Sequence, residues 1–320
     1  MIGVKKMQKI VKKNLYSNLL AIFVVYILLN MIIFPKFYIQ QTFAGITAWA
    51  INVLPSLLPF IFFSKILSSL NLIDKITKIF QKPFKKLFNT PAISSYSFFS
   101  SVISGYPVGA KITEELYSSG KITRTDACKM LSFCSTSGPM FIIGAVGAGM
   151  FNSTLAGYIM FTSHVLGAFL NGIIYRNIKV KEFDLEFKQI EKENKKLDIS
   201  SIVLDTALSV ISVGTIIAIF FVIVSSLSPI FSLLPNNISA VLSGFFEITK
   251  GCIDLSSNFS LFMATLIGTF IISFGGFSTL LQTQAMTTKL KLPIRLYCLQ
   301  KISHALLSTV IAFVLCCLFL

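Results

Sequence analysis

The sequence contains little charge, and especially little negative charge. Charged residues fill 13% of the 320 positions, with 13 Asp and Glu against 28 Lys and Arg, while 54% of the residues are hydrophobic. An ordinary soluble domain carries about 25% charged residues. The composition therefore predicts an all-α polytopic membrane protein, because runs of about 20 apolar residues are long enough to cross a bilayer. The alternating strands of about ten residues that a membrane barrel needs are not seen.

Patterns for metal binding, disulfides and catalysis are also missing. The chain has six cysteines without a CxxC pair, and only two histidines. This spacing predicts no metal, no cofactor and no disulfide framework. Cys134 and His164 offer a thiol and a base, but nothing supplies an oxyanion hole or a second acid. We therefore expect no catalytic residues and no enzymatic activity.

The net charge of +15 does not indicate nucleic-acid binding, because the basic residues cluster between apolar runs. Such clusters are typical of cytoplasmic loops. The N-terminal tail, 65–86, 121–129, 176–196 and 289–295 are basic, whereas the alternate connections hold Lys36 and little else. This pattern predicts a cytoplasmic N-terminus and a C-terminus on the opposite side of the bilayer.

The chain divides into about seven expected spans and two interrupted segments that read as re-entrant helical hairpins. Residues 71–91 alternate apolar and lysine positions at helical spacing, which favours an amphipathic helix on the membrane surface; an ordinary basic loop is the alternative. The expected spans are 15–34, 43–67, 122–150, 154–175, 202–226, 259–286 and 294–320, and the hairpins are 92–120 and 238–257.

An internal repeat relates the two hairpins. SGYPVGAK, from Ser104, aligns with SGFFEITK, from Ser243, and each copy has a lysine seven places after the serine and an acid four places further on. SFCSTSGPM then matches SFGGFSTLL, and SHVL matches SHAL, so that both histidines, His164 and His304, take part. Three matches in the same order predict a duplication.

An odd crossing between the copies inverts the second one, and inverted repeats with broken helices are typical of secondary transporters. We expect 1–91 to hold the N-terminal spans and interfacial helix, 92–178 the first repeat, 179–200 a charged cytoplasmic loop, 201–228 the linking span and 229–320 the second repeat.

Broken helices at membrane depth indicate a cavity, because non-helical backbone there must be covered by protein or water. A half-helix that begins at a break directs unpaired N–H groups and partial positive charge toward the tip, which favours anions. The candidate substrate-binding residues lie at the two tips and the two breaks: Ser104, Gly105, Tyr106, Pro107, Gly109, Lys111, Ser135, Thr136, Ser137, Gly138, Ser243, Gly244, Phe245, Glu247, Lys250, Gly275, Gly276, Ser278 and Gln282.

Several of these residues have two interpretations. Lys111 and Lys250 are either anion-binding cations or members of structural i,i+4 pairs with Glu115 and Asp254. Glu247 either carries a coupling proton or cation, or caps a half-helix. His164 and His304 are candidates for a proton relay with Glu247, or they hydrogen-bond the breaks. Helix packing is the alternative for the serines.

The stretch SGYPVGAKITEELYSSGKITRTDACKMLSFCSTSGPMFIIGAVGAGMF resembles the signature region of the YlbJ-like sporulation integral membrane proteins, within the group that carries a nucleoside-recognition gate domain. The resemblance covers essentially the whole chain. It implies a fold similar to concentrative nucleoside transporters and a location in the outer forespore membrane of the mother cell.

The resemblance also implies a partner, the anion dipicolinate, besides the lipid bilayer. Dipicolinate is a flat ring with two carboxylates, so Lys111 and Lys250 are candidates to hold one carboxylate each, with Tyr106 and Phe245 against the ring. Transport of nucleosides or other small solutes is the first alternative, and a non-transporting sporulation assembly protein is the second. Energy coupling and homo-oligomer formation stay open.

Overall fold

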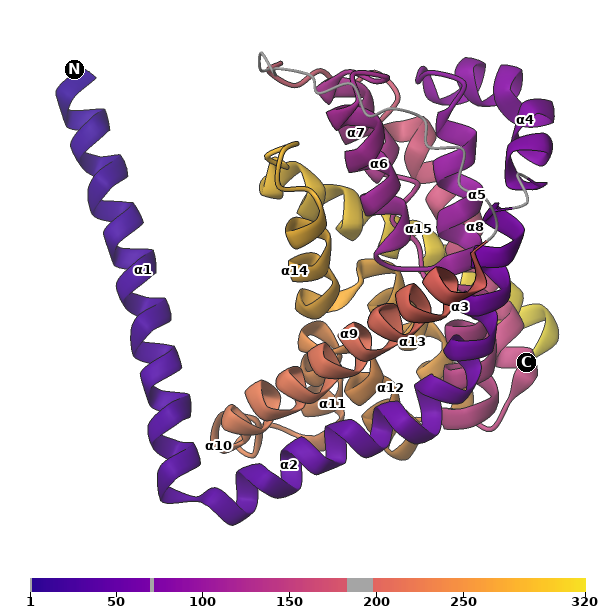
Figure 1. Ribbon diagram of the computed structural model, residues 1–320. Helices are drawn as coiled ribbons and strands as arrows, with labels where there is room; N and C mark the ends of the chain where they lie inside the picture. The colour runs from indigo at the N-terminus through magenta and orange to yellow at the C-terminus, as the bar shows by residue number, and fades with distance from the viewer. Residues whose placement is uncertain (1, 70–71, 183–197) are drawn as a thin grey trace.

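The computed structural model describes residues 2–69, 72–182 and 198–320, and every regular element among them is a helix (Figure 1). This confirms the predicted all-α class. The helices are α1 (Ile2–Ile33), α2 (Pro35–Ala48), the π-helix η1 (Trp49–Val53), α3 (Leu54–Ser69), α4 (Leu72–Phe88), α5 (Ser94–Ser104), α6 (Val108–Ser118), α7 (Arg124–Leu131), the π-helix η2 (Met140–Met150), α8 (Thr154–Ile174), α9 (Ile199–Ser226), α10 (Ser228–Phe231), α11 (Asn236–Phe246), α12 (Ile248–Asn258), α13 (Leu261–Phe274), α14 (Gly276–Met286) and α15 (Ile294–Phe319).

The same order of elements occurs twice. Each copy has a hairpin (α5–α6 and α11–α12), an interrupted helix (α7–η2 and α13–α14) and an unbroken helix (α8 and α15), and all four hairpin arms contain 11 residues. In Figure 1, α5 and α6 occupy the upper part of the molecule and α11 and α12 the lower part, with α9 running between them. The element order thus follows the repeat seen in the sequence.

Four helical stretches are long and apolar enough to cross a membrane: α8, α9, α13 with α14, and α15. The count reaches five only when 18–33 of α1 and 35–53, which are bent by 108° at Phe34, are taken together as one broken span. The remaining crossings of the seven expected stay a prediction. Helix already starts at Pro35, before the expected span 43–67, and continues through η1 into α3.

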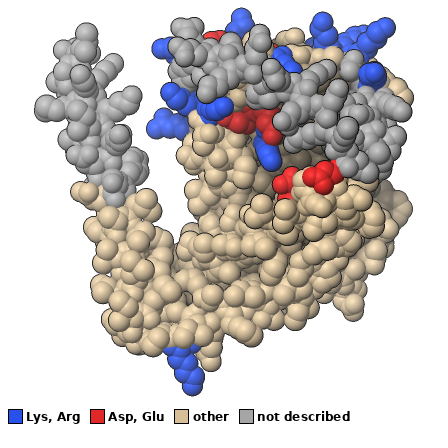
Figure 2. All heavy atoms as spheres, viewed as in Figure 1, with Lys and Arg blue, Asp and Glu red and all other residues tan. Residues whose placement is uncertain are grey.

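Within the basic segment, Leu72–Phe88 forms a helix, α4, and not a loop. Phe84 and Phe88 are buried and pack on Phe98, Phe133 and Phe169, so that α4 is fastened to the end of the first repeat. Lys78, Lys82, Lys85 and Lys86 are exposed. Figure 2 shows that most visible Lys and Arg side chains gather at the end of the molecule formed by α4, α6 and α7. The predicted charged loop 179–200 lies largely outside the described residues.

Glu114 joins the first hairpin to the second repeat at this basic end. Its carboxylate accepts the backbone N–H groups of Lys289 (2.8 Å) and Leu290 (3.2 Å) in the connection between α14 and α15. The buried guanidinium of Arg124 donates to the carbonyls of Leu290 (2.9 Å), Lys291 (2.6 Å) and Lys181 (2.6 Å). The connection is therefore held from both sides by charge-assisted hydrogen bonds.

We predict that Glu114→Ala speeds amide hydrogen exchange at Lys289 and Leu290 by about 10-fold or more, because a hydrogen bond to a charged group contributes about 1.5–3 kcal/mol. Glu115→Ala is the matched control, since Glu115 is exposed and no bond to its carboxylate is found among the described residues. Equal exchange in both variants would show that Glu114 does not hold the connection.

Gly109 allows the first hairpin to pack closely against the segment that follows α7. A Cβ at this position would collide with the carbonyl oxygen of Cys134 and lie 2.6 Å from the Cβ of Ser101. Gly251 in the second hairpin approaches the backbone of Gly244 in a similar way. Both hairpins thus depend on a glycine where two backbones meet.

Gly109→Ala is expected to destabilise the protein by about 3 kcal/mol or more, because the opposing atom is backbone and has no rotamer into which to escape. Gly149→Ala provides the control, since the nearest atom to its added Cβ is at 3.4 Å. Melting temperatures in detergent report the difference. Similar melting of the two variants would contradict the packing described for the hairpin.

Candidate functional site

A cavity lies where the two hairpin tips approach each other. Its empty volume, counted with its open mouth, is about 590 Å³. Residues from both tips, both breaks, α3, η2 and α9 form the wall: Leu57, Ile61, Ser104, Gly105, Tyr106, Ser137, Gly138, Phe141, Val213, Ile217, Glu247, Ile248, Thr249, Ser278, Thr279 and Gln282. The wall is mostly apolar and aromatic with a few polar groups, which is the ordinary composition of a small-molecule site.

The irregular backbone around the cavity has identifiable causes. Gly105 ends α5 with φ +75°, and Gly275 and Gly276 separate α13 from α14 with φ +94° and +63°. Glycine adopts these conformations without the penalty that other residues incur. The Cα of Gly138 would lie only 3.3 Å from a Cβ built on Gly105, so the first tip rests directly on the break after α7.

Tyr106 forms the wall at the first tip and is bonded from behind by a lysine. The ammonium of Lys301, on α15, donates to the Tyr106 hydroxyl at 2.6 Å and lies 5.0 Å from the centre of its ring. Lys301 also donates to the carbonyl of Ser135 (2.9 Å) and lies 3.5 Å from Nδ1 of His304. Its side chain is 3% exposed.

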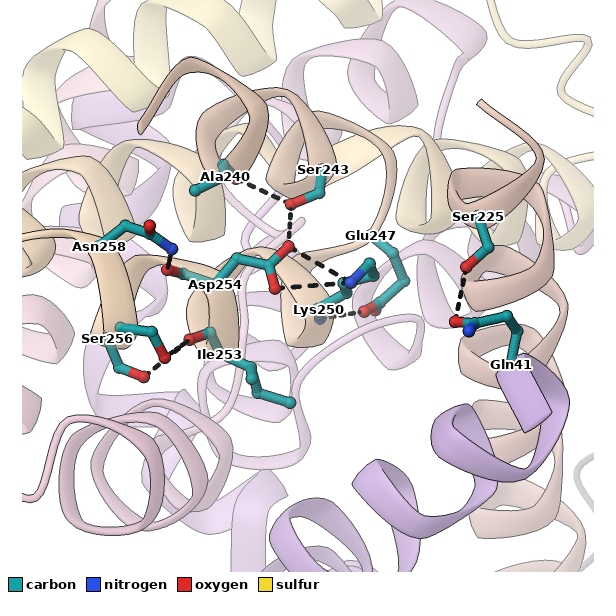
Figure 3. Close-up of polar contacts among 11 residues, drawn as sticks. Gln41, Ser225, Ala240, Ser243, Glu247, Lys250, Ile253, Asp254, Ser256 and Asn258 are labelled. Atoms are coloured by element: carbon teal, nitrogen blue, oxygen red, sulfur yellow. Dashed lines mark hydrogen bonds and ion pairs between the residues drawn. The ribbon is translucent and has the colours of Figure 1, made fainter. Parts of the chain in front are cut away.

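Glu247 forms the wall at the second tip. It is the N-cap of α12, and its carboxylate accepts the backbone N–H of Lys250 at 2.7 Å (Figure 3). The residue is buried, with 3% exposure. The capping interpretation thus has a geometric basis, and the carboxylate also reaches the cavity.

Lys250 is not among the residues that line the cavity. Its ammonium pairs with the Asp254 carboxylate at 3.4 Å, and the Ser243 hydroxyl donates to the same carboxylate at 2.6 Å (Figure 3). Lys250 also lies 5.5 Å from the centre of the Phe221 ring. The geometry corresponds to the structural pair, and not to a lysine at the tip.

Lys111 and Phe245 are also outside the wall. Lys111 is exposed on α6 and lies close enough to Lys65 to interact with it electrostatically; a pair with Glu115 is not found in the described part of the chain. Phe245 packs on Phe270 and Phe274, with ring centres 5.9 and 5.3 Å apart. Phe141, which the sequence reasoning did not select, contributes an aromatic side chain to the cavity.

The predicted site residues therefore fall into two sets. Those that line the cavity are Ser104, Gly105, Tyr106, Ser137, Gly138, Glu247, Ser278 and Gln282. Those that lie behind it or elsewhere are Pro107, Gly109, Lys111, Ser135, Thr136, Ser243, Gly244, Phe245, Lys250, Gly275 and Gly276.

The two histidines lie side by side behind the breaks, with ring centres 4.7 Å apart and the ring planes tilted by 39°. The N–H of Ser137 donates to Nε2 of His164 (2.9 Å), so the neutral ring carries its proton on Nδ1, which lies 2.8 Å from the Ser273 hydroxyl. His304 Nε2 lies 2.9 Å from the carbonyl of His164 and must donate to it, which leaves Nδ1 free to accept from Lys301. His164 thus fastens the first break, whereas His304 joins α15 to α8.

Lys301 was missed in the sequence, although a signal for it existed. It is a single cation well inside the predicted span 294–320, and an ionisable group at membrane depth is a functional hypothesis by default. The sequence analysis also did not select two polar residues near Lys301, Asn171 and Tyr297. Asn171 donates to the carbonyls of Ser132 and Gln300, and Tyr297 lies 2.6 Å from the Ser135 hydroxyl.

No group of three or more His, Cys, Asp or Glu side chains suited to a metal ion occurs among the described residues. The arrangement provides a cavity between the two hairpin tips that is suited to binding a small solute, with a hydrogen-bonded lysine behind one part of its wall.

The comparisons with known proteins agree with this architecture. Residues 50–154, which include the first hairpin and its break, match the family model described as Gate, nucleoside recognition. This part of the chain is similar to a nucleoside-recognition gate domain. It is also 26% identical over 308 residues to the sporulation integral membrane protein YlbJ of Bacillus subtilis (strain 168), covering 85% of this chain and 76% of YlbJ. The predicted resemblance to the YlbJ-like gate group is confirmed.

A solved structure shares the fold of this chain. It is a variant of CNTnw in an outward-facing state, with a TM-score of 0.51 and 14% identity over 95% of this chain and 85% of that one. At this identity the likeness concerns the fold alone, which is that of a concentrative nucleoside transporter. The chain is therefore a membrane protein of transporter-like architecture.

We predict that His164→Phe lowers the stability of the protein by about 1–3 kcal/mol, because the N–H of Ser137 would be left buried without an acceptor. His164→Gln should lose less, since its side-chain carbonyl oxygen is able to accept this bond. Thermal unfolding in detergent measures both. Equal melting of His164→Phe and the unaltered protein would refute the role of the imidazole at the break.

Proposed function

We propose that this protein transports dipicolinate across the outer forespore membrane during sporulation. The similarity to YlbJ supports the cellular setting, and the transporter-like fold supports the activity. The observation that carries the proposal is the cavity enclosed by two hairpin tips, each from a different repeat. A site between inverted repeats is what alternating access requires.

The chemistry of the wall suits a flat aromatic anion. Tyr106 and Phe141 offer rings, and the cation of Lys301 lies directly behind the Tyr106 hydroxyl. Hydroxyl and amide groups of Ser104, Ser137, Ser278, Thr279 and Gln282 complete the polar part of the wall. In this proposal the rings contact the substrate ring, and the polar groups bind its carboxylates.

The membrane orientation follows from the basic end of the molecule (Figure 2). Lys and Arg accumulate on the cytoplasmic side of membrane proteins. In our proposal the end formed by α4, α6 and α7 therefore faces the cytoplasm of the mother cell, with the N-terminus on the same side. The first hairpin then approaches the cavity from the cytoplasm and the second from the opposite side.

Transport of a nucleoside-type solute is the alternative that a specific observation favours. Glu247 places a carboxylate in the wall, and Gln282 and Ser278 place an amide and a hydroxyl nearby. A carboxylate accepts hydrogen bonds from sugar hydroxyls and repels an anionic substrate. A non-transporting assembly protein of the sporulation membrane is the second alternative, and it needs no solute in the cavity.

Uptake into proteoliposomes tests the proposal, with labelled dipicolinate and labelled uridine offered separately. We expect dipicolinate to enter faster than uridine, and Tyr106→Ala to slow its entry by about 10-fold or more, as a lost aromatic contact in a pocket does. Tyr158→Ala is the control, because Tyr158 is 56% exposed on the outer face of α8.

The outcomes separate the three functions. Preferred entry of uridine would establish the nucleoside-type alternative. Entry of neither solute above the level of empty vesicles, with a folded protein, would refute the proposed transport. An equal effect of Tyr106→Ala and Tyr158→Ala would remove the cavity from the transport path.

A further inference from the structure

We infer that Lys301 is a proton-binding site that couples proton movement to solute transport. The inference deepens the proposed function and depends on it for the choice of solute. It rests on the contacts of Lys301 and on its position between the cavity wall and the histidine pair.

The first observation is a buried cation without an acidic partner. Lys301 is 3% exposed, two turns into α15, and no Asp or Glu of the described residues lies within ion-pair distance of it. A buried charge is costly unless it is paired. Lys301 therefore gains a counter-charge only when an anion occupies the cavity, or it avoids the cost by releasing its proton.

The second observation is that the Lys301 amine has hydrogen-bond partners at this position in both its protonated and its neutral form. A protonated amine donates three hydrogen bonds, and Lys301 has three acceptors: the Tyr106 hydroxyl, the Ser135 carbonyl and Nδ1 of His304. A neutral amine keeps two N–H groups and gains a lone pair. The Tyr106 hydroxyl then rotates and donates to this lone pair, so that no polar group loses its bond.

The third observation is a path for the proton. The phenol of Tyr106 belongs to the cavity wall, and its hydroxyl lies 2.6 Å from Nζ of Lys301. One proton passes from Lys301 to the Tyr106 oxygen while the phenol's own proton passes to a water or an anion in the cavity. The ammonium becomes an amine, the phenol is regenerated and the acceptor gains the proton, with no change in any other bond.

Among the titratable groups that surround Lys301, we assign the change of charge to Lys301 itself. Of the titratable groups nearest to it, α15 contributes His304 and Tyr297, α8 contributes His164 and the first tip contributes Tyr106. The His164 ring is neutral because its Nε2 accepts the N–H of Ser137, and the His304 ring is neutral because its Nδ1 accepts from Lys301 while its Nε2 donates to the His164 carbonyl. The break between α13 and α14 presents glycine to Lys301, since a Cβ on Gly275 would lie 3.5 Å from its Cε.

An anion next to Tyr106 and a proton on Lys301 therefore favour each other. By linkage, binding of one increases the affinity for the other by the same factor. The species that crosses the membrane is the anion together with the proton of Lys301. Neutralisation of this buried cation by the anion also lowers the cost of enclosing a charged substrate between the hairpins.

Proton-coupled uptake into vesicles tests the inference, with a pH-sensitive dye in the lumen and dipicolinate or uridine outside. We expect entry of the carried solute to move protons in the unaltered protein. Lys301→Arg keeps the positive charge but does not release its proton, so solute binding should persist while proton movement falls to the level of empty vesicles. Tyr106→Phe keeps the ring and removes the hydroxyl, so it should slow proton movement more than solute binding.

Lys250→Met serves as the control, because Lys250 is paired with Asp254 outside the cavity. Its proton-to-solute ratio should equal that of the unaltered protein. Solute entry without protons, or proton movement retained in Lys301→Arg, would overturn the inference while leaving the proposed transport intact. Proton-coupled entry of uridine alone would overturn the proposed substrate and leave the proton site standing.

A second measurement does not depend on any solute and covers variants that fold poorly. Infrared difference spectra of the reconstituted protein, labelled with ¹⁵N-lysine, are recorded on a step from mildly acidic to mildly alkaline buffer. We expect an amine signal that is missing in Lys301→Met. Identical spectra for Lys301→Met and the unaltered protein would exclude proton exchange at Lys301, even if neither solute is transported.

Discussion

The structure depends on one constraint: every helix that breaks at membrane depth must find partners for its freed backbone groups inside the protein. The break after α7 satisfies it with side chains from the other elements. Ser137 N–H is accepted by the His164 imidazole, and the Ser135 carbonyl is bound by the Lys301 ammonium. These two bonds fix the break to α8 and α15, and so they bring the first tip, the histidine pair and Lys301 together.

The sequence was sufficient to predict those structural elements that follow from local sequence patterns. Gly-Pro-Gly at 105–109 and Gly-Gly at 275–276 break helices whatever surrounds them, and the apolar runs fix the class. The match of SGYPVGAK with SGFFEITK led to two hairpins, and the structure has two hairpins with arms of equal length. These features depend on residues that are close to one another in the chain.

The parts of the site that depend on which helix faces which were not accessible in the same way. Lys111 and Lys250 occupy equivalent places in the repeat, yet one is exposed and the other is paired with Asp254. A repeat fixes the position of a residue along its helix, but the rotation of that helix against its neighbours comes from packing. Lys301 reaches Tyr106 across 195 positions of sequence, and no local pattern relates the two. Its isolation in an apolar span was the only available indication.

The two hairpins are related by the repeat but are fastened differently, and this difference bears on which of them is able to move. The first is tied to the second repeat, by Glu114 at the α14–α15 connection and by Tyr106 at Lys301. The charged groups of the second are satisfied within the hairpin itself, by the Ser243, Lys250 and Asp254 cluster and by Glu247 on the amide of Lys250 (Figure 3). Displacing the first hairpin therefore breaks charge-assisted bonds between the repeats, whereas the second is able to move as a unit with its polar bonds intact.

Of the bonds that hold the first tip, the one to Lys301 depends on protonation, because the Tyr106 hydroxyl accepts a hydrogen bond from an ammonium and donates one to an amine. A proton at Lys301 thus acts on the hairpin that is most strongly held.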